Sequence, residues 1–520
     1  MRQCIQGIAL AVLLSTPAAA QLPALGTPRG VLRLEIGGDF ANASDQFADG
    51  TSQPYRAQFS APAIGAAFYP DLAPTQTRIA QLSGISTYAL SIGQATMQAQ
   101  ASIGTLRLGA TLGITSKLSL FGMVPIIRQQ IYMTYGFDSA GSNAGYNPAD
   151  PVFGSSAGAD SVNTFLGDYK TALDTLSARL QSGYYAGNPD SALAAATLAS
   201  GTIYYDNLDS LFVVSGTAGS FVPLAGSAAG QAMSAAVAGT QASLAALGVP
   251  SFTQPLPLPA DALSPADYTA YLTNPAGSIG ATPFVATTNF LLGDVELGAS
   301  YTIIDRWNRV GHPGGLRLVA QALVRLPTGY QPLPNDFVSI PTSDGQSDLQ
   351  VALVADVGGG KFGARFAGSY NDQLATTTER RVTLPSQPIP WSNRLASVTT
   401  DPGNDLALSA LPYFQLAPGF AIVGVVRYWS HGADAVEYAS STDAIPGVSA
   451  GELAVGTQRS ATVLGGGLSY APTQKAARVP LDAFWLYEVV VAASGGVVPK
   501  GTTIRMGLRV PIQLWGATTP

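Results

Sequence analysis

Residues 503–514 read TIRMGLRVPIQL, and the alternation in this stretch decides the fold. The even-numbered residues from Ile504 to Leu514 are all apolar, whereas Arg505, Arg509 and Gln513 stand between them. Because successive side chains on a β-strand point to opposite faces, one face of this strand is apolar and the other is cationic. Lipid on one side and water on the other is the environment of a transmembrane barrel strand.

The same period of two recurs along most of the chain. It is found at 31–40, 104–114, 118–126, 295–302, 316–325, 349–357, 362–371, 406–416, 420–428, 461–470 and 483–491. With 503–514 these are twelve segments, separated by turn residues such as those at 358–360 and 418–419. The pattern predicts an all-β protein, a transmembrane antiparallel β-barrel of twelve strands. The segment 53–100 could hold one further pair, which would make fourteen.

The connections alternate in length. Those after 114, 357 and 416 are short, whereas those after 40, 126, 326, 370 and 428 are much longer. Short turns at one end and long loops at the other are typical of periplasmic turns and extracellular loops.

The N-terminus has the features of a secretory signal. Arg2 precedes an apolar run from Ile5 to Leu14, and Ala18 to Ala20 form a small-residue cleavage site. We therefore expect residues 1–20 to be removed and the mature chain to enter the outer membrane of a Gram-negative-type cell. Cys4 is the one cysteine of the sequence, so the mature chain would have no disulfide and no thiolate metal site.

The composition excludes several classes of protein. Only 11% of residues are charged, against roughly 25% in ordinary soluble domains. The net charge of −6 argues against a nucleic-acid partner, which requires a basic surface. After the signal, no apolar run is long enough for a transmembrane helix.

Between 138 and 290 the apolar period lengthens to that of a helix. One set of residues with this spacing is Phe165, Tyr169, Leu173, Leu176 and Leu180. Helices are predicted at 165–180, 191–200, 227–247 and 264–272, the last beginning with a Ser-Pro N-terminal signal. This insertion could be a cap packed on itself, a plug, or a lid whose apolar set captures an amphipathic substrate. The chain then divides into a signal peptide (1–20), strands one to three with a long first loop (21–137), the extracellular helical insertion (138–290) and strands four to twelve (291–520).

Charged residues gather on the inward face of the predicted strands. They are Arg33, Glu35, Asp39, Arg107, Asp294, Glu296, Arg317, Arg325, Asp356, Arg365, Arg427, Glu488, Arg505 and Arg509. A basic side chain facing lipid near the midplane would cost roughly 2–4 kcal/mol, so this set indicates which face meets water. The residues could simply brace the barrel through ion pairs, or they could form a path that prefers anions.

Histidine is scarce, which limits the catalytic chemistry. His312 lies in a predicted periplasmic turn and His431 at the predicted extracellular rim. Ser430 adjoins His431, but on a strand the two side chains would face opposite ways. We therefore predict no enzyme, no cofactor and no metal site.

The hairpin at 106–125 resembles one family. Its strand LRLGATLGIT, the Ser116-Lys117 turn and the strand ending in Val124-Pro125 are similar to a hairpin of the phenol-degradation meta-pathway outer-membrane proteins. That family is related in architecture to the long-chain fatty acid transporters. The resemblance implies a monomeric barrel that admits hydrophobic small molecules, often with a plug or a capture groove.

The sequence thus predicts an outer-membrane channel or transporter for small hydrophobic or amphipathic molecules, gated by the helical cap. Its expected partners are outer-membrane lipids, lipopolysaccharide, the barrel-insertion machinery and a small-molecule substrate. Two alternatives remain, a non-transporting surface-binding protein and a barrel-embedded lipid hydrolase.

Overall fold

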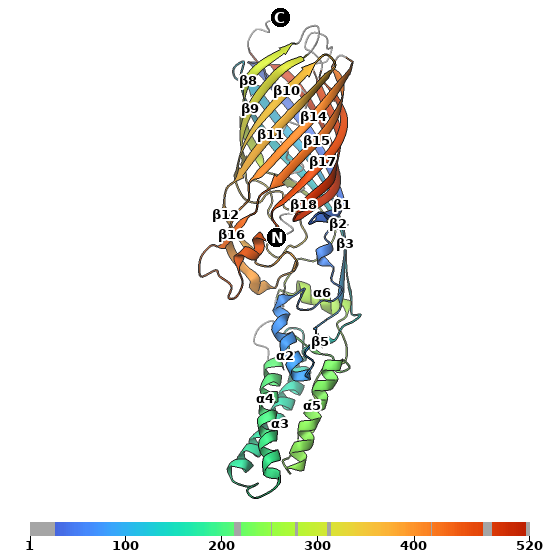
Figure 1. Cartoon of the computed structure of the whole chain (residues 1–520), viewed down its shortest axis with the longest axis vertical. Helices are drawn as coiled ribbons and strands as arrows, with labels where there is room; N and C mark the ends of the chain where they lie inside the picture. The colour runs from blue at the N-terminus through green and yellow to red at the C-terminus, as the bar shows by residue number, and fades with distance from the viewer. Residues whose placement is uncertain are drawn as a thin grey trace.

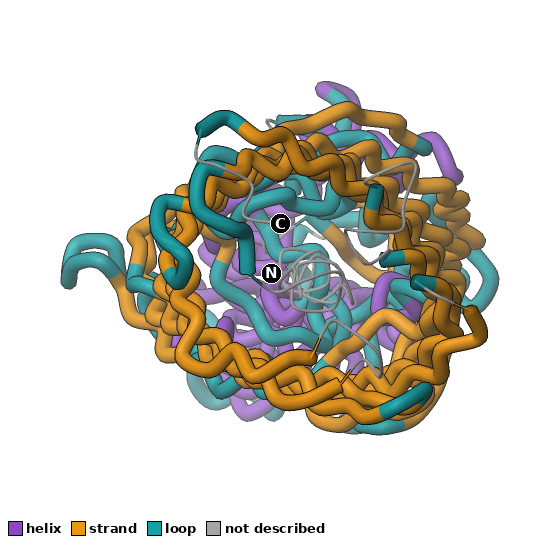
Figure 2. The backbone as a smooth tube through the Cα atoms, turned by 90° about the horizontal axis from the view of Figure 1, so that it is seen from above, coloured by secondary structure: helices purple, strands orange, loops and turns teal. Residues whose placement is uncertain are grey.

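A computed structural model describes residues 26–212, 220–250, 252–275, 279–308, 314–417, 419–471 and 481–515. The predicted signal peptide and His312 lie outside the described residues. A closed antiparallel barrel carries long connections at one end, and these build a cap with elongated helices (Figure 1). Seen along the axis, the strands form a ring (Figure 2).

Fourteen strands share the main sheet, and β2 (Thr51–Pro54) and β7 (Thr287–Leu292) are short additions to the barrel. The twelve barrel strands are β1 (Val31–Ala48), β3 (Gln94–Gly113), β4 (Leu118–Asp138), β8 (Val295–Asn308), β9 (Gly314–Leu326), β10 (Asp348–Gly359), β11 (Phe362–Gln373), β14 (Asp405–Ala417), β15 (Phe420–His431), β17 (Arg459–Tyr470), β18 (Asp482–Gly495) and β19 (Val497–Gln513). The first and last strands pair from Val31 opposite Gln513 onward, which closes the barrel. The predicted fold class and the count of twelve are confirmed.

The outer wall is apolar, as the alternation predicts. On β1, Leu34 and Ile36 are exposed while Arg33 and Asp39 are buried. The same division holds on β19, where Met506 and Leu508 are exposed and Arg505 is buried. An exterior of this kind is suited to contact with lipid.

The two ends of the barrel differ. We call one the turn end, because 114–117 and 360–361 make tight connections there. Gly360 has a φ of 63°, a conformation that glycine adopts without strain. At the other end, the loop end, the connections 49–93, 139–294, 327–347, 374–404 and 432–458 are long.

Helices in two of these connections build the cap. They are α2 (Ala73–Ser83), α3 (Ser156–Gln181), α4 (Asp190–Phe212), α5 (Ala228–Ala246) and α6 (Pro265–Thr273). The Ser155 and Ser227 side chains cap α3 and α5, and Ser264 forms a capping box with Asp267 at α6. A helix is found at each of the four places predicted in the insertion, although α3 begins before the predicted 165–180 and α4 runs beyond the predicted 191–200. None of the described helices is both long and apolar enough to cross a bilayer.

One prediction within the first loop is corrected. The segment 53–100 contributes no further strand pair to the barrel; it contains β2, the 3-10 helices η2 (Ala57–Phe59) and η3 (Pro70–Leu72), α2 and the start of β3. In α2, Pro74 lies in the first turn, and Thr75, Ile79 and Leu82 are buried on one face. That spacing is helical, and period-two reasoning misses it.

Shorter elements complete the loop end. Strands β12 (Thr376–Arg381), β13 (Leu395–Asp401) and β16 (Ala435–Tyr438) form a separate sheet, and β5 (Ala144–Tyr146) pairs with β6 (Phe221–Pro223). The 3-10 helices η5 (Ser392–Arg394) and η6 (Ala450–Ala454) flank the three-stranded sheet.

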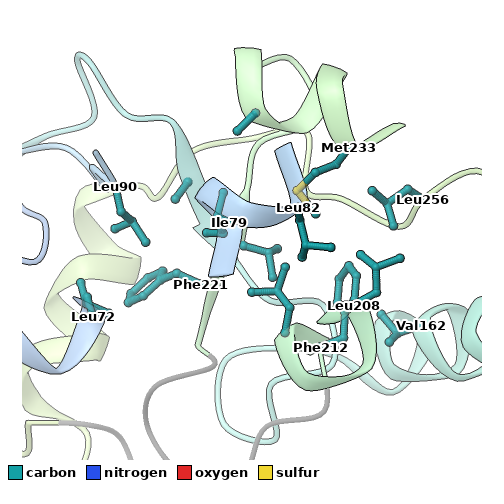
Figure 3. Packing of buried hydrophobic residues seen from close by; sticks show 14 of the residues in the cluster. Leu72, Ile79, Leu82, Leu90, Val162, Leu208, Phe212, Phe221, Met233 and Leu256 are labelled. Atoms are coloured by element: carbon teal, nitrogen blue, oxygen red, sulfur yellow. The ribbon is translucent and has the colours of Figure 1, made fainter. Parts of the chain in front are cut away.

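A single hydrophobic core joins the cap to the loop end of the barrel. Residues from α2, α3, α4 and α5 meet in it, with Leu82, Val162, Leu208 and Met233 among them (Figure 3). The same cluster includes Met97 of β3 and Phe337, Ile389 and Trp391 of the other loops. The cap is therefore packed onto the barrel mouth rather than tethered to it.

Candidate functional site in the barrel interior

A chain of ion pairs runs along the inward face and crosses the seam where the barrel closes. Asp39 on β1 pairs with Arg107 on β3 and lies 4.0 Å from Arg505 on β19. Arg505 contacts Glu488 on β18 at 3.1 Å, and Glu488 contacts Arg427 on β15 at 2.9 Å. Five strands are thus linked by alternating charges.

Gly465 on β17 allows the chain of ion pairs to extend from β18 to β15 across β17. It lies opposite Glu488 in the strand register, between β18 and β15. A Cβ at this position would clash with the Tyr487 backbone carbonyl oxygen of β18 and would meet the Glu488 side chain at 3.1 Å. Glycine therefore allows the close approach of β18 and also leaves room for Glu488 to reach Arg427.

Further pairs lie toward the turn end. Glu35 accepts from Arg509 at 2.7 Å, again across the β1–β19 seam. Arg365 and Asp356 form a two-pronged contact at 2.6 and 2.8 Å. Arg317 reaches Asp305 at 3.0 Å. The Arg33 guanidinium donates to the Gly26 carbonyl at 3.2 Å.

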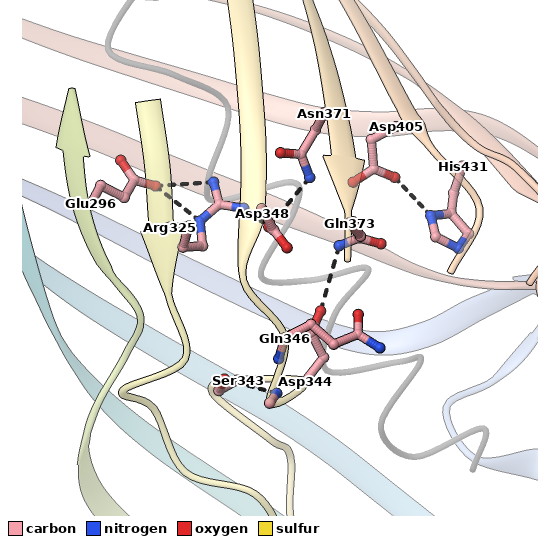
Figure 4. Close-up of polar contacts among 11 residues, drawn as sticks. Glu296, Arg325, Ser343, Asp344, Gln346, Asp348, Asn371, Gln373, Asp405 and His431 are labelled. Carbon is pink, nitrogen blue, oxygen red and sulfur yellow. Dashed lines mark hydrogen bonds and ion pairs between the residues drawn. The ribbon is translucent and has the colours of Figure 1, made fainter. Parts of the chain in front are cut away.

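A third group lies at the loop end (Figure 4). Arg325 bridges Glu296 at 3.0 Å and Asp348 at 2.5 Å, and the Asn371 amide donates to the same Asp348 carboxylate. The sequence-predicted charged residues on the strands therefore meet as pairs and short chains.

Asp294 has a different role from the other predicted residues. It lies between β7 and β8, and its carboxylate accepts from the Gly329 backbone N–H at 2.9 Å. It therefore holds the start of the connection 327–347 rather than pairing with an arginine across a strand.

Two ion-pair partners were not predicted. Asp348 obeys the alternation but stands one residue before the predicted strand, so the strand boundary excluded it. Asp305 follows an irregularity between Thr302 and Ile304 that shifts the register and reverses which residues face inward. Bulges of this kind leave no signal in the alternation itself.

His431 lies between two carboxylates at the loop end. Its Nδ1 is 2.7 Å from Asp405 and its Nε2 is 2.9 Å from Asp434. Both ring nitrogens are therefore occupied by acceptors, and neither is directed at a hydroxyl. Trp429 is buried inside the barrel and stacks near His431, because it has the inward parity of β15.

The connection 327–347 folds into the barrel mouth. Val338 and Ile340 pack against inward-facing residues of β1, β3 and β4, in a buried cluster with Ala41, Ile103 and Ile131. None of these strands neighbours β9 or β10, which the connection joins: β8 separates β9 from β4, and β3 and β1 lie farther around the ring. This connection, which we call the mouth loop, therefore covers part of the opening from the inside.

Side chains on both flanks hold the mouth loop through Phe337. The Phe337 carbonyl accepts from the Arg56 Nη1 at 3.1 Å. Its ring lies under the Arg381 guanidinium, 5.2 Å from it. Arg381 in turn donates to the Ile279 and Pro390 carbonyls, and burial lowers the pKa of Arg381 to about 10.

The apolar set considered for substrate capture lies in the cap core. Phe165, Tyr169, Leu173 and Leu176 are buried, and Leu180 is half-buried against them. In this arrangement these side chains pack α3 against its neighbours and are not presented to a ligand. Within the described ranges, no group of three or more His, Cys, Asp or Glu side chains is arranged to hold a metal ion.

Solved structures resemble this chain in overall architecture at low sequence identity. An outer-membrane channel from Pseudomonas putida F1 is 8% identical, with a TM-score of 0.41 and coverage of 95% of this chain and 98% of that one. The TodX monoaromatic hydrocarbon channel, as a deltaS2 mutant, is 8% identical, with a TM-score of 0.27 and coverage of 94% and 91%. The translocator domain of the autotransporter NalP from Neisseria meningitidis is 7% identical, with a TM-score of 0.32 and coverage of 98% of both chains.

No protein-family model matches the sequence, and no curated protein matches it either. The resemblance of the hairpin at 106–125 therefore remains an expectation.

Proposed function

We propose that this protein is an outer-membrane channel that admits small hydrophobic or amphipathic molecules, with the loop end outside the cell. The observation that carries the proposal is the mouth loop, whose Val338 and Ile340 lie against the inner wall of β1, β3 and β4. A barrel that served only as an anchor would have no need of an apolar loop held inside its mouth.

The barrel interior supports the same proposal. Most of the inward charged residues are paired, so they stay compatible with water without presenting a single sign of charge along the whole wall. The outer wall would meet lipid and, at the loop end, lipopolysaccharide. The cap would set which molecules reach the mouth.

The hydrolase alternative has less support. A nucleophile needs a base within hydrogen-bond distance, and both nitrogens of His431 already face carboxylates. The surface-binding alternative remains, since the cap is large and its outer surface is exposed.

The mouth loop can be shortened between Tyr330 and Thr342, which are hydrogen-bonded to each other. Thr342 donates its N–H to the Tyr330 carbonyl, and its hydroxyl accepts from the Tyr330 N–H at 2.8 Å, so the two residues are paired like the ends of a hairpin. Residues 331–341 can therefore be replaced by an Asn-Gly turn without moving β9 or β10.

The test compares this variant with the wild type in liposomes and planar bilayers. We expect faster entry of phenol into liposomes and a higher ionic conductance once the loop is shortened. A variant shortened in the exposed turn 440–443 is the control and should behave as the wild type. If neither protein passes phenol or ions, the channel proposal is wrong and the surface-binding alternative takes its place.

A further inference from the structure

Arg56 is an arginine in an unusual place. It follows β2 and begins η2, it is fully buried, and its backbone lies in the left-handed region with a φ of 61°. A non-glycine residue with this φ is uncommon, and strained positions of this kind gather at functional sites. Its N–H donates to the Gln46 side chain at 2.9 Å, which holds the conformation.

The guanidinium uses only part of its hydrogen-bonding capacity. Nη1 donates to the Phe337 carbonyl of the mouth loop, whereas Nε and Nη2 have no partner among the described residues. The Tyr55 ring lies 5.6 Å from the guanidinium carbon, a weak cation–π contact, but no carboxylate in the described part of the chain forms an ion pair with Arg56. A buried charge without a counter-charge is costly, so the native site is expected to receive an anion.

The two unpartnered nitrogens of Arg56 favour a particular kind of anion. Nε and Nη2 are adjacent parallel donors, and such a fork matches the two oxygens of a carboxylate. The same segment has two more buried groups that can donate and that have no hydrogen-bond partner within the described ranges, the Tyr55 hydroxyl and the Gln58 amide nitrogen. The surroundings therefore offer donors and no competing acceptor charge.

An apolar surface adjoins these donors. Tyr55 belongs to the same buried cluster as Ile103, Ile131, Val338 and Ile340, which joins the inner barrel wall to the mouth loop. A ligand reaching Arg56 with its carboxylate would thus place its apolar body where Val338 and Ile340 now lie.

We propose that Arg56 is the anion-recognition point of a binding site for amphipathic carboxylates, formed between the inner wall and the mouth loop. The site rests on the proposed function, because the ligand must enter through the mouth. Since the loop covers the site, binding requires the loop to move away from the wall.

The test measures binding of two matched probes to the purified protein in nanodiscs. The probes are 4-phenylbutyrate and 4-phenylbutan-1-ol, which differ in the headgroup and share the apolar body. A two-pronged charge-assisted contact should make the carboxylate bind about ten- to a hundredfold more tightly than the alcohol. In Arg56→Gln the two probes should bind equally, and in Arg56→Lys the preference should be reduced because lysine lacks the fork.

Arg381→Gln is the matched control. Arg381 lies on the other flank of Phe337 and donates to backbone carbonyls, so its loss should loosen the loop while preserving the preference for the carboxylate. Equal binding of both probes by the wild type, or a preference that survives in Arg56→Gln, would overturn the proposal.

Entry of the neutral alcohol into liposomes is measured in parallel. If the alcohol does not enter through the wild type, the channel proposal is wrong. If the alcohol enters but the two probes bind equally, only the proposed Arg56 site is wrong.

Discussion

At the scale of single residues, Glu488 is the point on which the ion-pair chain depends. It is 2% exposed and serves both Arg427 and Arg505. Glu488→Gln would leave two buried guanidiniums to share a neutral amide, and removing one member of a buried pair costs about 3–5 kcal/mol. Equilibrium unfolding in urea, with the protein in lipid vesicles, should show a loss of this size.

An exposed ion pair in the cap supplies the comparison. Lys170 and Asp174 are 2.7 Å apart on α3, with both side chains more than half exposed. Asp174→Asn should leave the unfolding midpoint unchanged, because exposed pairs contribute little to stability. Equal effects at Glu488 and Asp174 would mean that the interior chain is solvated and does not brace the barrel.

Residue-scale prediction from sequence succeeded where alternation alone decides the direction of a side chain. Arg33, Arg365 and Arg505 are buried as the period of two requires. Asp305 was not predicted, because a local register shift reverses which residues of β8 face inward. Arg56 was not predicted for another reason. It lies in irregular backbone, where no periodicity indicates what surrounds a side chain.

At the scale of elements, the mouth loop should respond to pH through Asp344. This carboxyl accepts from the Gln346 N–H at 3.0 Å, and burial raises the pKa of Asp344 to about 7, with the Asp348 carboxylate adding to the rise. A released loop would have an ordinary carboxyl, so the docked loop holds its proton more tightly. Docking is therefore penalised above about pH 7 and gains strength as the pH falls toward the ordinary carboxyl value.

Hydrogen exchange of the amides at 331–341 measures this effect. After correction for intrinsic exchange rates, protection should be greater at about pH 5.5 than at pH 8. Asp344→Asn should reduce the difference, since an amide does not titrate; the remainder comes from Asp294, which holds the start of the same loop and whose pKa burial raises to about 6. Protection that rises with pH would contradict the assignment.

The joint between cap and barrel is a second element-scale feature. The Tyr268 hydroxyl on α6 lies 2.9 Å from the Tyr69 hydroxyl and 3.0 Å from the Tyr135 hydroxyl of β4. Burial raises the pKa of both Tyr69 and Tyr268 well above the ordinary value, so these groups act as neutral hydrogen-bonding partners.

Tyr268→Phe should weaken the cap without disturbing the barrel. It leaves two enclosed hydroxyls short of a partner, at a cost of about 1–3 kcal/mol. The far-ultraviolet signal of the helices should melt earlier, while the heat-dependent gel mobility of the barrel stays the same. Tyr184→Phe, at a site 65% exposed, is the control. A simultaneous loss of both signals would show that cap and barrel unfold as one unit.

Prediction at the element scale was accurate for helices whose ends are marked in the sequence. Ser264 caps its helix as the sequence indicates. The three-stranded sheet of β12, β13 and β16 was missed because its strands come from two separate loops and are short. The mouth loop was missed as well, since its contacts join residues more than two hundred positions apart, such as Arg56 and Phe337. Local pattern cannot report such pairings.

At the scale of the whole molecule, the apolar exterior should make the barrel sensitive to charge only where lipid covers it. Leu353 lies in the middle of β10 and is 49% exposed, and Leu193 on α4 in the cap is 44% exposed. The two side chains are thus alike in type and exposure but differ in the medium that they face. Leu353→Arg should reduce the free energy of folding in vesicles by roughly 2–4 kcal/mol, the cost of an arginine near the bilayer midplane.

Leu193→Arg should change that free energy by less than about 0.5 kcal/mol, as for an ordinary surface substitution in water. Both variants are measured by urea titration in vesicles of the same lipid, and then in vesicles with shorter acyl chains. A thinner bilayer lets the arginine at 353 reach water more easily, so its cost should fall, while the value for 193 stays constant. If the two substitutions cost the same in both lipids, the exposed apolar belt is not the surface that lipid covers, and the division of the molecule into a membrane barrel and an aqueous cap would have to be abandoned.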